Sequence, residues 1–372
     1  MKDSDLGNGR LHGILPSGVW LTGLLLIIPW IYGQEPGDAS GPDGAGEGMV
    51  QDTLITAADL FEGTDPLHVT LTLNLKDYRK AKYKEDYVPV ALTYEVNDTL
   101  TLNRSVRIKS RGNFRKEHCQ MAPFWLNLKR PDSADTVGTQ LNKIKIVTHC
   151  KNSTQYDNYV LREYLAYRIY NLISPVSFRA RLIRMTYVDR GRKDSKSEHW
   201  AFMIEPEELL AERFGALAVK NDMLGMRLMN PEDFDLMALY LYMIGNPDFS
   251  ITGRHNVKIL GLEGFGTSGY TPVPYDFDYS GLVNTYYAVP GENLGIETVR
   301  DRYFLGLCRN DEIFSKTIER INDHREEIYQ LINEFPYLDQ KEKSDMIGYL
   351  ESYFVIASEP ERLINALRLT CQ

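Results

Sequence analysis

Cysteine is scarce in this sequence, and its spacing excludes the common zinc sites. The four cysteines are Cys119, Cys150, Cys308 and Cys371, and no two of them form a CxxC pair, the arrangement from which most structural zinc sites are built. If the chain is exported, disulfides can form. Cys119 and Cys150 flank neighbouring predicted strands and are the candidate pair. The alternative is four reduced, mostly buried thiols.

The sequence also lacks an excess of basic residues. Its 42 Lys and Arg are outnumbered by 51 Asp and Glu, which gives a net charge of -9. A general nucleic-acid-binding protein normally has a basic balance, so we expect no nucleic-acid partner. The 43% hydrophobic and 25% charged residues are typical of a globular protein.

No hydrophobic run is long enough to cross a bilayer comfortably, which takes about 20 residues. The apolar run from Val19 to Tyr32 is shorter and follows Arg10. This pattern favours a signal peptide over residues 1–33 and therefore an exported protein, periplasmic, secreted or on the cell surface. The alternative is an uncleaved anchor through residues 13–32, which would associate the N-terminus with a membrane. Residues 34–50 are rich in Gly, Pro and Asp and predict a flexible linker.

The remainder, 51–372, shows strand patterns first and helix patterns later. Apolar and polar residues alternate with period two in Leu67–Asn74 and Val88–Val96, and further strands are expected at 100–109, 124–128, 143–147, 181–188 and 200–204. Helical spacing appears over 159–173, 207–214 and 231–244, and from about 297 onward, with Asp311 as the expected N-cap of a helix over 312–335. This order predicts an α+β fold with a β-rich lobe over about 65–204 and a helical lobe over about 205–372.

A glycine motif in the second half does not indicate a dinucleotide site. Gly264-Phe-Gly266-Thr-Ser-Gly269 matches GxGxxG, but Pro272 and Pro274 follow and forbid the helix that such a site needs. The glycines are better explained as the tip of a hairpin joining 257–260 to 271–275. That hairpin would bring Asp248 and Asn256 toward Asp276 and Asp278.

Carboxylate and amide oxygens are the ligands that Mg²⁺ prefers. In an extended segment, Asp276 and Asp278 would lie on one side and Phe277 on the other, packed into the core. Asp248, Asn256, Asp276 and Asp278 are therefore the candidates for a metal-dependent phosphate site. The alternative is that they are ordinary turn and capping residues.

The order of motifs resembles that of the CotH family (spore coat protein H-like) of atypical protein kinases. The matching segments are Ser110-Arg111-Gly112-Asn113, Leu126-Asn127-Leu128-Lys129, Lys143-Ile-Lys145, Leu161-Arg162-Glu163, Asn246/Asp248, His255/Asn256 and Pro274-Tyr275-Asp276-Phe277-Asp278. The resemblance implies that 51–372 forms an atypical protein-kinase-like domain. It also implies Mg²⁺ and ATP as cofactors, with a nucleotide and a protein substrate as partners.

The resemblance implies roles for single residues by the logic of kinases. Lys145 or Lys143 would neutralise nucleotide phosphates, and Glu163 would pair with that lysine. Glu205, which follows a strand, would lie where the adenine meets the hinge. The remaining roles are phosphate contact by Arg111, orientation or deprotonation of the acceptor hydroxyl by Asp248, and Mg²⁺ ligation by Asn256, Asp276 and Asp278.

The sequence departs from kinases in two places. It has no glycine-rich loop of the kinase type, for which Arg111-Gly112-Asn113 is the candidate substitute. Asp248 stands eight residues before Asn256, whereas HRDxxxxN places the pair five apart.

From the resemblance as a whole, the leading hypothesis is phosphoryl transfer from ATP to protein Ser/Thr hydroxyls. The alternatives are an inactive binding protein that uses the tyrosines near 270–287, and a metal-dependent hydrolase.

Overall fold

A computed structural model describes residues 57–372 except 85, 98–99, 129–142, 221–223 and 263–268. The expected signal segment (1–33), the linker (34–50), Lys129 and most of the glycine motif lie outside these residues. The chain separates into two units, Met1–Thr53 and Leu54–Gln372, and every described residue belongs to the second unit. No helix in the described part of this unit has both the length and the apolar character of a membrane span.

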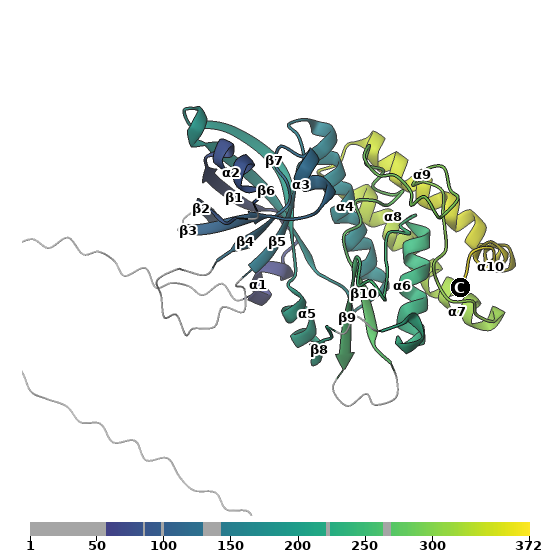
Figure 1. Cartoon of the computed structure of the whole chain (residues 1–372). Coiled ribbons are helices and arrows are strands. Elements are labelled where there is room, and N and C mark those ends of the chain that lie inside the picture. The colour runs from purple at the N-terminus through teal and green to yellow at the C-terminus, as the bar shows by residue number, and fades with distance from the viewer. Residues whose placement is uncertain (1–56, 85, 98–99, 129–142, 221–223, 263–268) are drawn as a thin grey trace, which may run out of the picture. The chain divides into compact units, whose positions relative to one another are not determined.

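The β-rich part is a closed barrel (Figure 1) with the strand order β1-β2-β3-β4-β5-β7-β6. Its strands are β1 (Leu67–Leu73), β2 (Val88–Asn97), β3 (Leu100–Ser110), β4 (Phe124–Asn127), β5 (Lys143–Thr148), β6 (Ala180–Asp189) and β7 (Ser195–Ile204). The neighbours are antiparallel except β1 and β6, which pair in parallel from Leu67↔Ile183 to Leu73↔Asp189. That pairing closes the sheet on itself, and closure protects the strand edges that an open sheet would expose.

Helix α4 (Thr154–Ile173) connects β5 to β6 and packs against β7. Its apolar residues are buried almost around its whole circumference, from Val160 to Ile173, so it lies inside the molecule between the barrel and the later helices. The helix begins five residues before the expected start at Tyr159, and it ends at the expected residue, Ile173. The chain then passes through β6 and β7 into α5 (Glu207–Arg213).

The C-terminal part is mainly helical and includes a small sheet of order β10-β9-β8 (Figure 1). Its elements after α5 are β8 (Ala216–Ala218), α6 (Pro231–Met243), β9 (Val257–Leu262), β10 (Thr271–Pro274), α7 (Asp311–Asn322), α8 (Arg325–Glu334), α9 (Gln340–Ala357) and α10 (Pro360–Arg368). The expected hairpin is present as β9 and β10, paired antiparallel from Val257↔Pro274 to Leu260↔Thr271. The α+β organisation, with a β-rich region followed by a helical one, is confirmed.

Three helix predictions were wrong in detail. Helical structure was expected from about residue 297, but the first helix after β10 begins at Asp311. The helix expected over 312–335 is two helices, α7 and α8, separated at Asp323 and His324. Its N-cap is Asn310 rather than Asp311, because the Asn310 side chain accepts the Ile313 N–H at 2.9 Å. Three short helices were not predicted: α1 (Ala57–Glu62), α2 (Leu75–Ala81) and α3 (Phe114–His118).

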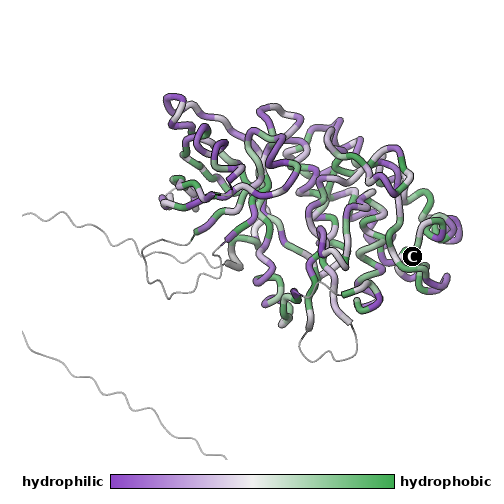
Figure 2. The backbone as a smooth tube through the Cα atoms, viewed as in Figure 1, coloured by the Kyte–Doolittle hydropathy of each residue, from purple (hydrophilic) through white to green (hydrophobic). Residues whose placement is uncertain are grey.

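Two hydrophobic cores support these parts. One fills the barrel, and the other joins α4 to the helices and the small sheet. Hydrophobic colour follows the strands and inner helices in Figure 2, whereas the outer end of the β6–β7 hairpin is hydrophilic. Two disulfides are present, Cys119–Cys150 and Cys308–Cys371. The first is the expected pair, and the second was not predicted.

Candidate active site

The candidate site is built around one arginine, Arg115, which was not among the residues selected from the sequence. It lies on α3, just after the turn that follows β3, where Gly112 has a φ of +82°. Its guanidinium lies 2.9 Å from Asp276 Oδ1, 3.1 Å from Asp278 Oδ2 and 3.5 Å from Glu163 Oε2. One buried cation therefore contacts three carboxylates that come from two distant segments of the chain.

The three carboxylates form a compact group. One oxygen from each of Glu163, Asp276 and Asp278 lies within 4.8 Å of the others. Glu163 projects from α4, and its Oε1 is buried with no hydrogen-bond partner within the described part of the chain. Such a donor set suits a hard divalent cation, and the unpartnered oxygen is where a further ligand bond could form.

Asp276 and Asp278 converge by a different geometry from the expected one. Asp276 has a φ of +65°, so the segment is not extended at that point. Its N–H donates to the Tyr167 hydroxyl at 2.8 Å. Phe277 is fully buried, with ring centroids 4.7 Å from Tyr167 and 5.8 Å from Tyr240. The prediction that Phe277 packs into the core is confirmed, and this anchor fixes the carboxylate on each side of it.

Burial and the neighbouring charges shift the pKa values of these three acids in different directions. Burial, reinforced by Asp276 and Asp278, raises the pKa of Glu163 despite the opposing charge of Arg115. Burial also raises the pKa of Asp278 to about 6, against Arg115 and a hydrogen bond from Tyr287, whose hydroxyl donates to Asp278 Oδ2 at 2.9 Å. For Asp276, burial is outweighed by Arg111, Arg115 and Lys145, and its pKa is lowered. Asp276 is therefore the most firmly ionised member.

Asp248 and Asn256 are held against each other. Asn256 Nδ2 donates to the Asp248 carbonyl oxygen at 2.9 Å and to Asp248 Oδ2 at 3.0 Å. His255 Nε2 lies 3.0 Å from Asp248 Oδ1. Ser250 and His255 exchange two backbone hydrogen bonds, of 3.0 and 2.9 Å, and so fold the extra residues into a tight turn. The eight-residue spacing therefore does not separate Asp248 from Asn256.

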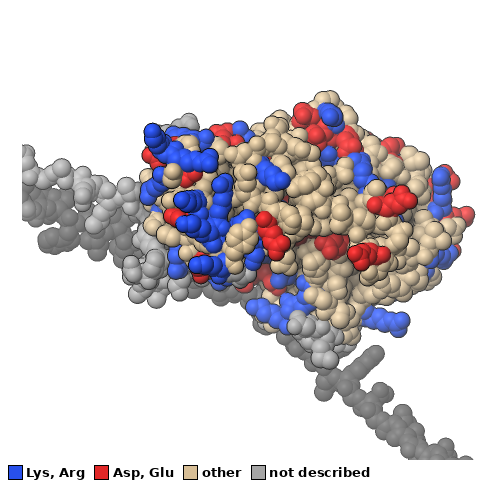
Figure 3. Space-filling view, turned by 45° about the horizontal axis from the view of Figure 1, so that its top comes forward, with Lys and Arg blue, Asp and Glu red and all other residues tan. Residues whose placement is uncertain are grey.

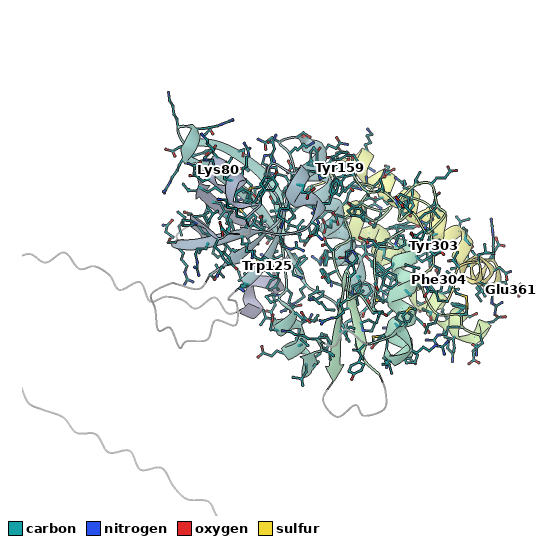
Figure 4. All side chains as sticks on the ribbon, in the orientation of Figure 1. Lys80, Trp125, Tyr159, Tyr303, Phe304 and Glu361 are labelled. Carbon is teal, nitrogen blue, oxygen red and sulfur yellow. A yellow bond between two sulfur atoms is a disulfide. The ribbon has the colours of Figure 1, made fainter. Side chains whose placement is uncertain are left out.

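The expected ion pair between Lys145 and Glu163 is not formed. Lys145 Nζ lies 4.1 Å from the Tyr275 ring centroid and 5.6 Å from that of Trp125, a residue labelled in Figure 4. No described carboxylate lies within ion-pair distance of it, because Arg115 takes the place beside Glu163. Burial lowers the pKa of Lys145 to about 7, and the charges of Arg111 and Lys258 act in the same direction.

Of the other candidates for phosphate and hinge contacts, one lies in the carboxylate group and two lie outside it. Arg111 Nη2 lies 3.4 Å from Asp276 Oδ2, so Arg111 belongs to the group. Lys143 is exposed at the start of β5. The carboxylate of Glu205 is buried between Arg179 and Arg213, each with a nitrogen 2.8 Å away. Only the backbone of Glu205 is left for a hinge contact, and its N–H already donates to the Arg179 carbonyl.

Two features hold this group in place from outside. Cys119, one residue past α3, is bonded to Cys150, two residues past β5, and the N–H groups of Gln120 and Met121 donate to the Cys150 carbonyl. Arg162, next to Glu163, donates to the Leu282 carbonyl and contacts Asp345 of α9. The arginine-bearing helix and the glutamate-bearing helix are thus both fixed to their surroundings.

Arg115 was missed because its role depends on tertiary pairing. The one local signal was its place four residues after Arg111, in a segment with several cations. Lys116 and His118 lie in the same basic segment, and His118 stacks on Phe114 instead. Only the positions of α4 and of the Asp276 segment distinguish Arg115 from its neighbours.

Comparison with known proteins gives little support to any assignment. No family model matches the chain, and no curated protein matches it. Among solved structures, the chain is similar to a crystal structure of a Helicobacter pylori proinflammatory kinase, CtkA, at 13% sequence identity. The similarity covers 70% of this chain and 96% of that one, with a TM-score of 0.38. At that score it carries no weight for the fold or the function.

Proposed function

We propose that this protein transfers the γ-phosphoryl group of ATP, with Mg²⁺, to Ser/Thr hydroxyls of a protein substrate. The observation that carries the proposal is the buried group of Glu163, Asp276 and Asp278. The charge of Asp248, which Asn256 holds in place, reaches this group and raises the pKa of Asp278. Phosphoryl transfer asks mainly for positioning and charge stabilisation, and this arrangement offers both.

The order of the elements supports the proposal. A strand with a half-buried lysine (β5, Lys145) precedes a helix with a buried glutamate (α4, Glu163), followed by two strands and α5. Asp248 and Asn256 then precede a hairpin, and Asp276 and Asp278 come directly after it. Protein kinases present their lysine, glutamate, catalytic-loop and metal-binding residues in this order.

Within the proposal, Mg²⁺ would be held by Asp276, Asp278 and Asn256, and when bound it would neutralise charge on the phosphates. Asp248 would accept the proton of the substrate hydroxyl, and His255 and Asn256 fix its two carboxylate oxygens. Arg111, 3.4 Å from Asp276 Oδ2, and Lys145, whose charge acts on Asp276, would contact phosphate oxygens. Arg115 would hold Glu163 in place, the task that the lysine performs in protein kinases.

The test is labelling with γ-labelled ATP and Mg²⁺, using the protein itself and a generic Ser/Thr substrate as acceptors. Asp276→Asn should lower the rate by about a hundredfold or more, because it removes a charged ligand. Asp235→Asn is the matched control, since Asp235 is also a buried carboxylate contacting an arginine, Arg309, but lies outside the group. Absence of labelling by the wild-type protein, with no thermal stabilisation by Mg²⁺ and ATP, would contradict the proposal.

A second candidate is a non-catalytic binding protein on the same scaffold. The observation in its favour is that Arg115 already neutralises part of the acidic group. Of the tyrosines predicted to form a recognition surface, Tyr286 is exposed whereas Tyr287 is buried against Asp278. Catalysis is excluded if Asp276→Asn and Asp248→Asn leave the cellular phenotype unchanged.

Export is part of the proposal. The two disulfides support it, because such bonds persist mainly in oxidising compartments. Fractionation of cells that express the full chain, with the mass of the mature protein, tests both export and cleavage near residue 33. Recovery of the full-length chain from the cytoplasm would contradict this part of the proposal without touching the phosphotransferase assignment.

A further inference from the structure

A groove on the β-rich end of the molecule is rich in cations. It lies between α2 and the β6–β7 hairpin, and we call it the basic groove. Its exposed cations are Lys76, Arg79, Lys80, Arg192 and Lys196. Figure 3 shows blue side chains gathered over this end, and Lys80 is labelled there in Figure 4.

The groove is concave rather than flat. Two cavities, of about 280 and 610 Å³, share Arg79, Asp189 and Arg192 in their walls. The smaller one reaches down to His149 and Asn152, and the larger one extends along α2 past Lys80. The two cavities therefore adjoin, and Arg79 of α2 and Arg192 of the hairpin turn line both of them.

The two sides of the groove are fixed to each other. Asp189, at the end of β6, accepts the Leu75 N–H of α2 at 3.1 Å and the Gly191 N–H of the hairpin turn at 3.0 Å. The one described carboxylate in the walls is therefore buried and engaged with backbone donors. Asp77 and Asp194 lie on the same segments, but they line neither cavity.

The cations of the groove are not neutralised by the residues that the structure describes. None of the five forms an ion pair within this part of the chain. By contrast, Arg300, Arg309 and Arg325, three half-buried arginines of the helical part, each contact a carboxylate. A gathering of unpaired like charges opposes the compact state, and an anionic ligand would relieve that repulsion.

We propose that the basic groove binds an acidic segment of a polypeptide. Five exposed cations line the two adjoining cavities, which suits a polypeptide segment that places carboxylate or phosphate groups against several of them. A membrane surface fits less well, because the site is recessed and Tyr83 is the only large exposed hydrophobic residue among the described residues of its walls. A long nucleic acid would meet the remaining surface of a protein whose net charge is -9.

This inference does not rest on the proposed phosphotransferase activity. None of the cations of the groove belongs to the carboxylate group around Arg115. Binding of an acidic peptide can therefore be measured in the absence of ATP. A protein without phosphotransferase activity could still bind such a peptide.

The experiment measures fluorescence anisotropy of a labelled poly-glutamate peptide titrated with the full chain at low salt. The test variant is Arg79→Glu/Arg192→Glu. The matched control is Lys220→Glu/Lys341→Glu, which makes the same charge change at two exposed lysines outside the groove. The test variant should weaken binding by about tenfold or more, whereas the control should change it little, and added salt should weaken the wild-type complex.

The result overturns the proposal in three cases. One is failure of the wild-type chain to bind the peptide. The second is an equal loss in both double variants, which would make the effect one of net charge. The third is tighter binding of an oligonucleotide, or of vesicles containing phosphatidylglycerol, with loss in the groove variant alone. Circular dichroism of both variants checks that these surface changes leave the fold intact.

Discussion

At the scale of single residues, the molecule shows two basic side chains in opposite situations near the same acids. Arg115 is buried and contacts three carboxylates, whereas Lys145 is largely buried and contacts only aromatic rings among the described residues. Arginine suits the first position because its planar guanidinium presents several donors at once and stays charged. Lysine suits the second because it can give up its proton when desolvated.

Replacing Arg115 should leave uncompensated buried charge. We expect Arg115→Met to lower the free energy of unfolding by about 3–5 kcal/mol, measured by urea denaturation without divalent ions. Added Mn²⁺ should restore part of this loss, because it can take up the negative charge of the three carboxylates. The matched control is Arg309→Met, which also breaks a buried pair, with Asp235, and which Mn²⁺ should not restore. Equal responses of the two variants to Mn²⁺ would show that the acidic group holds no metal.

The depressed pKa of Lys145 predicts how stability depends on pH. Burial lowers this pKa to about 7 in the folded chain, against about 10.4 for an ordinary lysine. Between these values the unfolded chain binds more protons, so the contribution of Lys145 to the free energy of unfolding rises with pH. Below about pH 7 both states are protonated, and the dependence disappears.

The measurement compares urea denaturation of wild-type protein and Lys145→Met over that range. The difference in free energy of unfolding, wild type minus variant, should rise by at most about 1.4 kcal/mol per pH unit. A smaller slope is expected, because part of the Lys145 side chain still meets solvent. A difference that stays flat between about pH 7 and pH 10 would show that Lys145 titrates normally.

At the scale of elements, the short helix α3 depends on its attachments. Five residues are too few for a stable helix in isolation. Its position comes from the Cys119–Cys150 bond, the backbone hydrogen bonds to Cys150 and the ion pairs of Arg115. The disulfide therefore also helps to determine where Arg115 stands.

Removing the disulfides one at a time separates stability from site geometry. Cys119→Ala/Cys150→Ala and Cys308→Ala/Cys371→Ala should each lower the free energy of unfolding by about 3–4 kcal/mol, since they release loops with sequence separations of 31 and 63. Only the first variant should change Mn²⁺ affinity, measured by calorimetry on the folded protein, because only that bond is next to α3. A change of affinity in both variants, or in neither, would contradict this coupling.

At the scale of the whole molecule, the longer helices and strands were predictable from the sequence, whereas their pairing and packing were not. The strand patterns, α4 and the β9–β10 hairpin follow from local periodicity. Helices α2 and α3 are too short to show a period, and the closure of the barrel through β1 and β6 joins strands more than a hundred residues apart.

The candidate site shows the same division. Asp248, Asn256, Asp276 and Asp278 could be selected from residue types and spacing. Glu163 was selected only through the family resemblance, as the partner of the strand lysine. That its partner is Arg115 rather than Lys145 could not be predicted, because both cations lie on segments that reach α4, and only packing decides between them.

The position of Arg115 has a consequence for the order in which the protein folds and binds a metal ion. Many metal sites are held open by the ion itself, so the chain cannot finish folding until the ion arrives. Here the carboxylates already have an internal counter-ion, Arg115. If the group binds Mg²⁺ as proposed, folding and loading would be separate events, because the carboxylates do not wait for the ion to be neutralised. The ion would then share the acids with Arg115, and repulsion between the two cations would raise the concentration of divalent ion that the site needs.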